Sequence, residues 1–243
     1  MTKTALITGV SSGIGLAQAG IFLGNGWRVY GIDQASKPDL TGDFHFLQLD
    51  LTGDFHFLQL DLTGDLSPVF SWCQTVDVLC NTAGILDDYR PHLDISEDEL
   101  ARIFAVNFFT VTRLTRPYLQ QMVDRQSGII INMCSIASSL AGGGGSAYTA
   151  SKHALAGFTK QLALDYAKDK VQIFGIAPGA VQTGMTQKDF EPGGLADWVA
   201  DQTPIGRWTQ PSEIAELTFM LATGKLASMQ GQIITIDGGW SLK

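Results

Sequence analysis

Short apolar runs alternate along this chain with longer segments in which apolar residues recur at helical spacing. The apolar runs cover residues 5–7, 27–32, 76–80, 128–133, 171–176 and 232–236. Runs that are apolar almost throughout suit strands buried on both faces of a parallel sheet. The pattern therefore predicts an α/β fold, with a doubly wound parallel sheet, helices on both faces and a single domain over residues 1–243.

Local signals mark the helices between these runs. The segment Leu16–Leu23 looks amphipathic, and Asn25-Gly26 follows it where a helix C-cap is expected. Ser96-Glu97-Asp98-Glu99 has the spacing of a capping box, which opens a helix. Residues 147–168 form one long helical pattern, and Pro211 suits a first helical turn. Strand and helix thus alternate from one end of the chain to the other.

Residues 40–50 recur identically as residues 51–61, and a third copy begins at residues 62–65. The repeated Phe-His-Phe-Leu-Gln-Leu is a good strand sequence, but only one copy can form the third strand of the sheet. We expect the second copy, Phe55–Leu60, to form it, because a parallel crossover needs about a dozen residues. The alternative is that the first copy forms it. The spare copy would be either an exposed apolar strand, prone to edge pairing or subunit contact, or a neutral insertion.

The composition favours a soluble, cytoplasmic protein that acts on small molecules. Of the 243 residues 45% are hydrophobic, and the formal net charge is −8. Neither nucleic acid nor an anionic membrane attracts such an acidic chain, so we expect neither as a partner. The three cysteines lack metal-site spacing, so we expect buried, reduced thiols and no metal. No apolar run is long enough to span a bilayer, and the first residues contain no signal-peptide core.

The first strand turns through glycines into the first helix, over Thr8-Gly9-Val10-Ser11-Ser12-Gly13-Ile14-Gly15. Such a turn places backbone N–H groups and the positive end of a helix where a pyrophosphate can lie. Gly9 would permit the tight turn, Gly13 a close approach of the phosphates, and Gly15 close packing of helix on strand. The other predicted cofactor contacts in this turn are Ser11, Ser12 and Ile14. The alternative is a strand-to-helix connection that binds nothing.

Asp33 ends the second strand, close to the distance at which an acidic residue binds the adenosine ribose of a dinucleotide. A carboxylate accepts hydrogen bonds from the ribose hydroxyls and repels a 2′-phosphate. We therefore expect NAD as the cofactor in preference to NADP. Lys37 is the cation that could reach the same position.

The candidate catalytic residues are Asn107, Ser135, Tyr148 and Lys152. Tyr148 and Lys152 are four residues apart on one helix, so an ammonium can lie near a phenol oxygen. Lowering the pKa of a tyrosine from about 10 to about 7 takes about 4 kcal/mol, which a lysine and an oxidised nicotinamide could supply. Tyr148 would then be a general acid/base, and Ser135 could hydrogen-bond the substrate oxygen. Taken singly, Tyr-x-x-x-Lys also fits a solvated helix face, and Asn107 a satisfied internal polar residue.

The chain resembles the short-chain dehydrogenase/reductase family almost from end to end. The motifs that carry the resemblance are Thr8-Gly9-x-x-x-Gly13-Ile14-Gly15, Asn81-x-Ala83-Gly84, Asn107, Ser135, Tyr148-x-x-x-Lys152, Pro178-Gly179 with Thr183, and Asp237-Gly238-Gly239-Trp240. The resemblance implies a Rossmann-type fold, a homotetramer, and hydride transfer between a nicotinamide and the substrate carbon. It also implies that Tyr148 exchanges the proton, Ser135 positions the substrate oxygen, Lys152 binds the nicotinamide ribose and Asn107 holds a proton-relaying water.

The same resemblance extends the predicted cofactor contacts beyond the glycine turn. Asp61 and Leu62 would flank the adenine, or Asp50 and Leu51 if the first copy forms the strand. The further contacts that the family implies are Asn81, Ala83, Gly84, Tyr148, Lys152, Pro178, Gly179, Val181 and Thr183. The chain departs from the family at Thr82, which replaces the second asparagine of Asn-Asn-Ala-Gly, and after the second strand, where the duplicated segment replaces a helix.

The substrate is less determined by the sequence. Residues 177–186 are similar to the 3-oxoacyl-[acyl-carrier-protein] reductase branch, which typically uses NADPH and needs a basic surface for its acidic carrier protein. Arg125, Lys168 and Lys170 are candidates for that surface, but the net charge opposes it. We therefore expect an NAD(H)-dependent oxidoreductase of secondary alcohols and ketones. The alternatives are the carrier-protein reductase, with an acyl thioester substrate, and a non-catalytic nucleotide-binding scaffold. Residues 137–146 and 185–201 are expected to frame the substrate.

Overall fold

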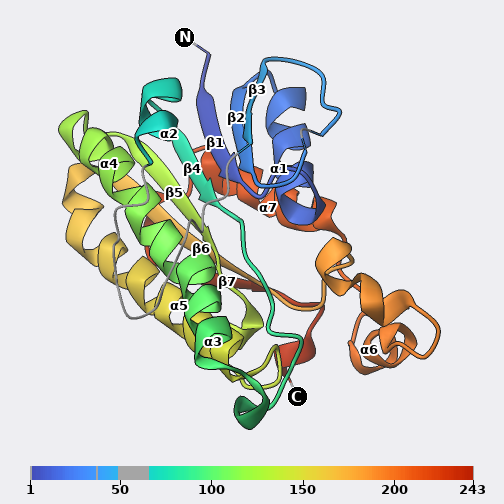
Figure 1. Ribbon diagram of the computed structural model, residues 1–243. Coiled ribbons are helices and arrows are strands. Elements are labelled where there is room, and N and C mark those ends of the chain that lie inside the picture. Colours follow the sequence, from blue (N-terminus) through green and yellow to red (C-terminus); the bar gives the residue numbers. More distant parts are fainter. Residues whose placement is uncertain (1, 37, 49–65, 243) are drawn as a thin grey trace.

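The computed structural model describes residues 2–36, 38–48 and 66–242, and one parallel sheet of seven strands runs through them. The strands are β1 (Thr4–Thr8), β2 (Arg28–Asp33), β3 (Phe44–Gln48), β4 (Val78–Asn81), β5 (Gly128–Met133), β6 (Val171–Pro178) and β7 (Ile233–Ile236). They lie in the order β3-β2-β1-β4-β5-β6-β7 (Figure 1). The order reverses between β1 and β4, where an open α/β sheet forms its ligand crevice. The predicted doubly wound sheet is confirmed.

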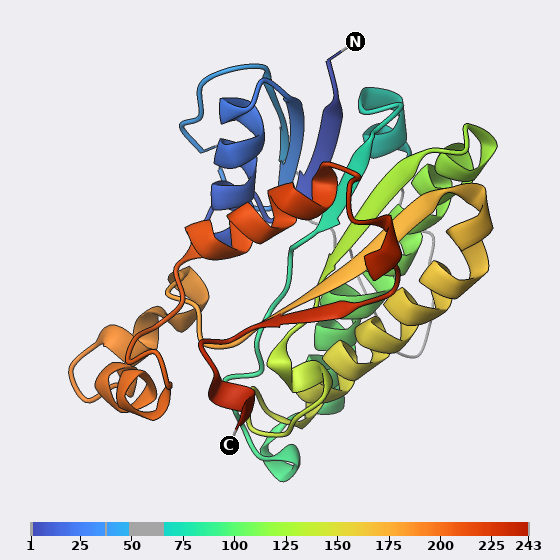
Figure 2. The ribbon, with the colours of Figure 1, turned by 180° about the vertical axis from the view of Figure 1, so that it is seen from behind.

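Helices cover both faces of this sheet (Figure 1). On one face lie α1 (Gly13–Gly24) and α7 (Pro211–Ala222), which Figure 2 shows side by side in the view from behind. On the other face lie α2 (Ser67–Trp72), α4 (Thr110–Asp124) and α5 (Ser146–Tyr166). The short helix α6 (Ala196–Gln202) projects beyond the carboxyl edge of the sheet. That projection leaves α6 beside the ends of the central strands.

Alternation along β1 explains why each face of the sheet has its own core. Successive strand residues point to opposite faces. Ile7 packs in the cluster that contains Phe22 of α1 and Leu221 of α7. Leu6 packs in the cluster that contains Tyr118 of α4. The central strands are therefore apolar on both faces, as the sequence pattern predicts.

The first copy of the duplicated segment forms the third strand, so the expectation that Phe55–Leu60 forms it is wrong. Residues Phe44–Gln48 pair with β2 in parallel, with His45 opposite Tyr30. The ten residues between Asp33 and Phe44 suffice, because residues 34–36 and 38–43, the described part of this connection, contain no helix. Fully extended, ten residues reach about 35 Å, about twice the length of a five-residue strand. Asp61 and Leu62 lie outside the described residues, as do Asp50 and Leu51.

Helix α3 (Glu97–Phe104) continues through a π-helical turn, Ala105–Phe109, into α4. The predicted capping box starts α3: the Glu99 N–H donates to Ser96 Oγ, and the Ser96 N–H donates to the Glu99 carboxylate. π-Turns within α-helices often occur at functional sites. This one carries the candidate residue Asn107.

Candidate active site

A cleft of about 830 Å³ opens at the carboxyl ends of the strands. Its walls come from the segments that follow β1, β2, β4, β5 and β6, from the start of α5, and from α6. The predicted cofactor contacts that line it are Gly9, Ser12, Gly13, Ile14, Gly15, Asp33, Ala83, Gly84, Tyr148, Lys152, Pro178, Gly179, Val181 and Thr183. Ser135 lines it as well. The fold thus brings most of the predicted site together.

The glycine turn has the close contacts that a phosphate cradle requires. Gly9 has φ of +77°, and a Cβ on Gly15 would lie 2.1 Å from the Gly9 carbonyl oxygen. A side chain fits at neither position. Ser12 is the N-cap of α1 but makes no capping bond with its side chain, so the first N–H groups of the helix have no side-chain acceptor there. Since such groups bind anions, the turn fits the pyrophosphate of a dinucleotide.

Asp33 is held beside this turn by two backbone groups. Its Oδ2 accepts the Ser11 N–H at 2.9 Å, and its Oδ1 accepts the Ala35 N–H at 2.9 Å. The Ser11 hydroxyl donates to the carbonyl of Ser36 at 2.8 Å, and Ser11 does not line the cleft. Ser11 therefore orients Asp33, and the carboxylate remains in the cleft wall.

Asn81 lies at the predicted motif, but its side chain is buried in the protein and does not line the cleft. Its amide donates to Asn132 Oδ1 at 2.8 Å and to Thr115 Oγ1 at 3.1 Å. Asn132 in turn donates to Thr159 of α5 at 2.9 Å. This buried chain ties β4 and β5 to the helices that cover them. The Asn81 side chain thus supports the sheet behind the site.

Thr8 fixes the backbone of the same motif. Its hydroxyl accepts the N–H groups of Thr82, at 2.9 Å, and of Ala83, at 3.0 Å. The Thr82 hydroxyl donates to Gln18 of α1 at 2.7 Å. Threonine at position 82, where the chain departs from the family pattern, therefore links the end of β4 to α1.

Ser135, Tyr148 and Lys152 meet at the inner end of the cleft. All three are largely buried, and Ser135 lies close enough to the phenol of Tyr148 to lower its pKa. Lys152 Nζ donates to the carbonyl of Met133 at 2.7 Å and lies 5.6 Å from the centre of the Tyr148 ring. Ser135 follows β5, and the other two are one turn apart on α5. A hydroxyl, a phenol and an ammonium are thus presented together.

Burial dominates the protonation of this group. It raises the pKa of Tyr148 to about 12, and the nearby Ser135 opposes this rise without cancelling it. Burial also lowers the pKa of Lys152 to about 8. Among the groups of this chain, Lys152 therefore does not bring the pKa of Tyr148 toward neutrality. A pKa near neutrality would therefore also require the positive charge of the bound nicotinamide.

Asn107 lies behind Lys152 in the π-helical turn. Its Oδ1 accepts the Ile85 N–H at 2.8 Å, and its Nδ2 donates to the Ile85 carbonyl at 2.9 Å and to Ser151 Oγ at 3.2 Å. A Cβ on Gly84 would lie 3.2 Å from Asn107 Oδ1 and 3.6 Å from Lys152 Nζ. Asn107 thus holds the segment after β4 close to the lysine.

Asp87 is a site residue that the sequence reasoning missed. Its buried carboxylate accepts the Gly145 N–H at 2.7 Å and the Tyr148 N–H at 2.9 Å. It thereby binds the first turn of α5, the helix that carries Tyr148. No motif marks this position. The one hint in the sequence is that Asp87 is an acidic residue three positions after the Asn81-x-Ala83-Gly84 motif.

Metal ligands, cysteines and membrane-spanning helices were the other features considered from the sequence. Within the described ranges, His, Cys, Asp and Glu form no group of three or more that could hold a metal. Cys73, Cys80 and Cys134 are buried free thiols, as predicted, and burial raises the pKa of each. None of the helices in the part of the chain that the structure describes is long and apolar enough to cross a membrane.

Comparisons with known proteins agree with this geometry. The family model described as short chain dehydrogenase matches residues 3–193. A cyclopentanol dehydrogenase from Comamonas sp. (strain NCIMB 9872) is 31% identical, over 98% of this chain and 97% of its own. The structure of a 4-hydroxyisoleucine dehydrogenase complexed with NADH superposes with a TM-score of 0.90 and 26% identity, covering 100% of both chains. The structure of a candidate NAD(P)-dependent gluconate 5-dehydrogenase from Beutenbergia cavernae, with NADP bound at low occupancy, superposes with a TM-score of 0.87 and 28% identity. The match covers 99% of this chain and 97% of that one.

Proposed function

The chain belongs to the short-chain dehydrogenase family, and on that premise we propose that it transfers a hydride between NAD(H) and a secondary alcohol or ketone. As a member of this family it is an oxidoreductase of alcohol and carbonyl groups that uses a nicotinamide cofactor. The observation that carries the proposal is the meeting of Ser135, Tyr148 and Lys152 in a cleft that begins at the glycine turn.

Each of these residues has a role that its contacts support. In reduction, Tyr148 donates its phenolic proton to the carbonyl oxygen, which Ser135 also hydrogen-bonds. In oxidation, the hydroxyl proton returns to the Tyr148 phenolate. Lys152, one turn along α5, binds the ribose of the cofactor, and with the cofactor bound its ammonium and the oxidised nicotinamide together offset part of the cost of ionising the phenol. The nicotinamide supplies or accepts the hydride.

Asn107 has a supporting role in this proposal. Both polar atoms of its side chain already bind Ile85 or Ser151. Asn107 therefore positions the segment after β4 against Lys152. A proton-relaying water, which the family resemblance implies, would be held by the backbone of Asn107 and not by its amide.

Asp33 supports NAD in preference to NADP. The carboxylate lines the cleft at the end of β2, where an adenosine ribose would meet it. A 2′-phosphate there would face a negative charge. The cationic side chains among the described lining residues are Arg102 of α3 and Lys152 of α5. Neither belongs to the loops after β1 and β2, where a 2′-phosphate would need it, and Lys37 lies outside the described residues.

The carrier-protein alternative receives no comparable support. Arg125, one of its candidate basic residues, donates to the backbone carbonyls of Ser127 and Val76. Lys168 and Lys170 lie with Asp169 in one short segment. Lys168 and Lys170 are both exposed, but two lysines with a carboxylate between them in the chain give weak support for an acidic partner.

The test compares Tyr148→Phe with Tyr166→Phe, a matched control at the far end of the same helix. Reduction of a ketone panel is measured with NADH and with NADPH, and NADH binding is followed by fluorescence. We expect turnover with NADH, a fall of about 10²–10⁴-fold in Tyr148→Phe, and little change in Tyr166→Phe. Full activity in Tyr148→Phe would contradict the mechanism, and a preference for NADPH would contradict the role of Asp33.

A further inference from the structure

Exposed apolar side chains gather at the mouth of the cleft. Tyr89, Met185, Leu195 and Trp198 are each about half exposed, at 53%, 48%, 55% and 54%, and all four line the cleft. Trp240 joins them there, with its ring centre 6.2 Å from that of Trp198. Large apolar groups that face water around one cavity indicate a ligand that covers them.

One wall of the mouth is the segment before and within α6, and aromatic packing fixes it from behind. Trp208 Nε1 donates to the carbonyl of Ala196 at 2.8 Å, and the ring centres of Phe190 and Trp208 lie 4.8 Å apart. These contacts hold the first turn of α6. The side chain of Trp198, in the same turn, therefore stays in the wall of the cleft.

The opposite wall is a strained turn. Asp88 and Tyr89 have φ of +52° and +57°, although neither is glycine. Consecutive left-handed residues with side chains are costly, and they persist only where the surroundings impose them. Asp87 binds the start of α5 on one side of the turn, and Arg90 pairs with Glu99 on the other. The backbone is therefore strained at the residues that place Tyr89 in the cleft wall.

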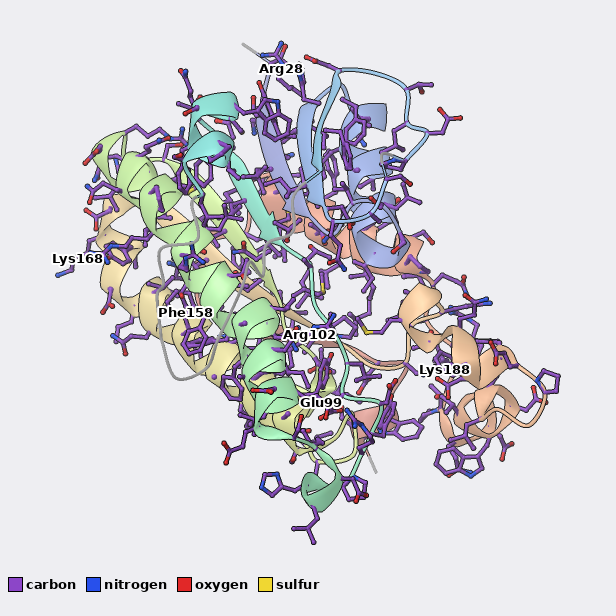
Figure 3. The ribbon with its side chains drawn as sticks, in the orientation of Figure 1. Arg28, Glu99, Arg102, Phe158, Lys168 and Lys188 are labelled. Atoms are coloured by element: carbon purple, nitrogen blue, oxygen red, sulfur yellow. The ribbon has the colours of Figure 1, made fainter. Side chains whose placement is uncertain are left out.

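The two walls face each other. Lys188 pairs with Asp88 at 3.4 Å, and burial, followed by the negative charge of Asp189, raises the pKa of Tyr89. Figure 3 shows Lys188 on the α6 side and Arg102 on the side of α3 that faces the segment leaving β4. Tyr89 and the α6 segment therefore enclose one space between them.

The charges at this mouth disfavour an anionic substrate. Asp88 and Asp189 line it, and the Lys188 ammonium is already paired with Asp88. Thr186 is not free to bind a polyol, because its hydroxyl contacts the Val181 carbonyl and the Thr183 N–H. Arg102 of α3 also lines the cleft, and the two aspartates outnumber this cation.

From these contacts we infer that the substrate is a neutral secondary alcohol or ketone with a bulky apolar group, and that Tyr89 and Trp198 hold this group between them. The inference rests on the proposed function, since it concerns the substrate of the same site. It sets the chain apart from relatives named for gluconate, which is an anionic polyol.

The experiment uses three ketones that differ in the group beside the carbonyl: 4-phenyl-2-butanone, the carboxylate 4-oxopentanoate, and fructose. Each is reduced with saturating NADH by the full chain and by the variants Tyr89→Ala, Tyr89→Phe, Trp198→Ala and Met220→Ala. Met220 is an exposed apolar residue of α7 outside the cleft and is the matched control. NADH affinity is measured for every variant.

We expect kcat/KM for 4-phenyl-2-butanone to exceed that for the other two ketones by about tenfold or more. Tyr89→Ala and Trp198→Ala should lower it about tenfold through KM with NADH affinity unchanged, while Tyr89→Phe and Met220→Ala should retain it. Faster reduction of 4-oxopentanoate or fructose, or an unchanged KM in both alanine variants, would overturn the inference and leave the oxidoreductase in place. No turnover of any of the three ketones, with NADH bound, would remove the proposed function as well.

Discussion

The carboxylate of Asp87 accepts the backbone N–H of Tyr148 at 2.9 Å, so a residue from the loop after β4 fixes the proposed proton donor on α5. The same carboxylate accepts the Gly145 N–H at 2.7 Å, and its side chain is buried. A negative charge at a helix N-terminus is favourable, and charged hydrogen bonds are the stronger kind. The loop and the helix are therefore held together at the site.

Replacing Asp87 by Asn should disturb the position of Tyr148 without removing any atom of the proposed chemistry. An amide oxygen can accept from these N–H groups, but the amide nitrogen of Asn cannot. We expect the free energy of unfolding to fall by about 2 kcal/mol and kcat to fall by about tenfold. Denaturant unfolding and steady-state reduction of a ketone by NADH measure the two effects.

The matched control for this prediction is Asp98→Asn, an acidic residue in the first turn of α3. A purely structural role for Asp87 would lower stability alone. We therefore expect kcat to fall while the KM for NADH stays within about twofold, and Asp87→Glu to recover part of kcat. Wild-type kcat in Asp87→Asn would show that Asp87 does not position Tyr148.

Tyr148 should remain protonated well above neutral pH in the protein without cofactor, because burial raises its pKa to about 12. Tyrosinate absorbs near 295 nm, so a pH titration of the wild type minus that of Tyr148→Phe isolates this one residue. We expect no difference between the two curves from pH 7 to about 10.5. The other four tyrosines are common to both proteins. A difference with a midpoint near pH 7 would mean that Lys152 alone outweighs burial.

Asp33 should decide between the two nicotinamide cofactors. Asp33→Ala removes the proposed acceptor of the ribose hydroxyls, and a charged hydrogen bond of this kind contributes about 1.5–3 kcal/mol. We expect the Kd for NADH to rise by about ten- to hundredfold and the Kd for NADPH to fall or stay constant. The control is Asp39→Ala, an exposed acid in the same connection. Equal weakening of both cofactors would indicate a structural role for Asp33, through Ser11 and Ala35.

The features that the sequence predicted well depend on short-range patterns. Residues 128–133 are apolar almost throughout and form β5 with the predicted bounds. Gly9 and Gly15 occur where the backbone leaves no space for a side chain. Tyr148 and Lys152 share a helix face because of their spacing alone. In each case a local rule determined the position.

The features that the sequence did not predict depend on contacts between distant segments. Asp87 meets Gly145 and Tyr148 about sixty positions away, and nothing near it in the chain indicates that. The buried bonds of Asn81 likewise depend on how β4 packs against β5 and α5. Identical copies of one strand sequence carry no local information about which of them pairs with β2. Only the tertiary pairing distinguishes them.

The duplicated segment provides its own matched experiment, because each residue of the first copy has an identical counterpart eleven positions later. Phe46 of β3 packs against the core cluster on the α1 and α7 face, and its counterpart is Phe57. We expect Phe46→Ala to lower the free energy of unfolding by about 1–3 kcal/mol, since Phe46 is partly buried. Phe57→Ala should leave it within about 0.5 kcal/mol. Chemical denaturation of the two variants makes the comparison.

Removing residues 51–61 extends this test. The deletion joins Asp50 to Leu62, and the next four residues remain Leu-Thr-Gly-Asp, as in the full chain. Because Phe44–Gln48 already form β3, we expect the shortened protein to fold, to bind NADH within about twofold of the wild-type affinity, and to unfold at a similar temperature. If the second copy can take the place of a first copy weakened by Phe46→Ala, the single variant understates the loss of stability. The double variant Phe46→Ala/Phe57→Ala then gives the full loss in the free energy of unfolding. Greater destabilisation by Phe57→Ala than by Phe46→Ala would assign the strand to the second copy.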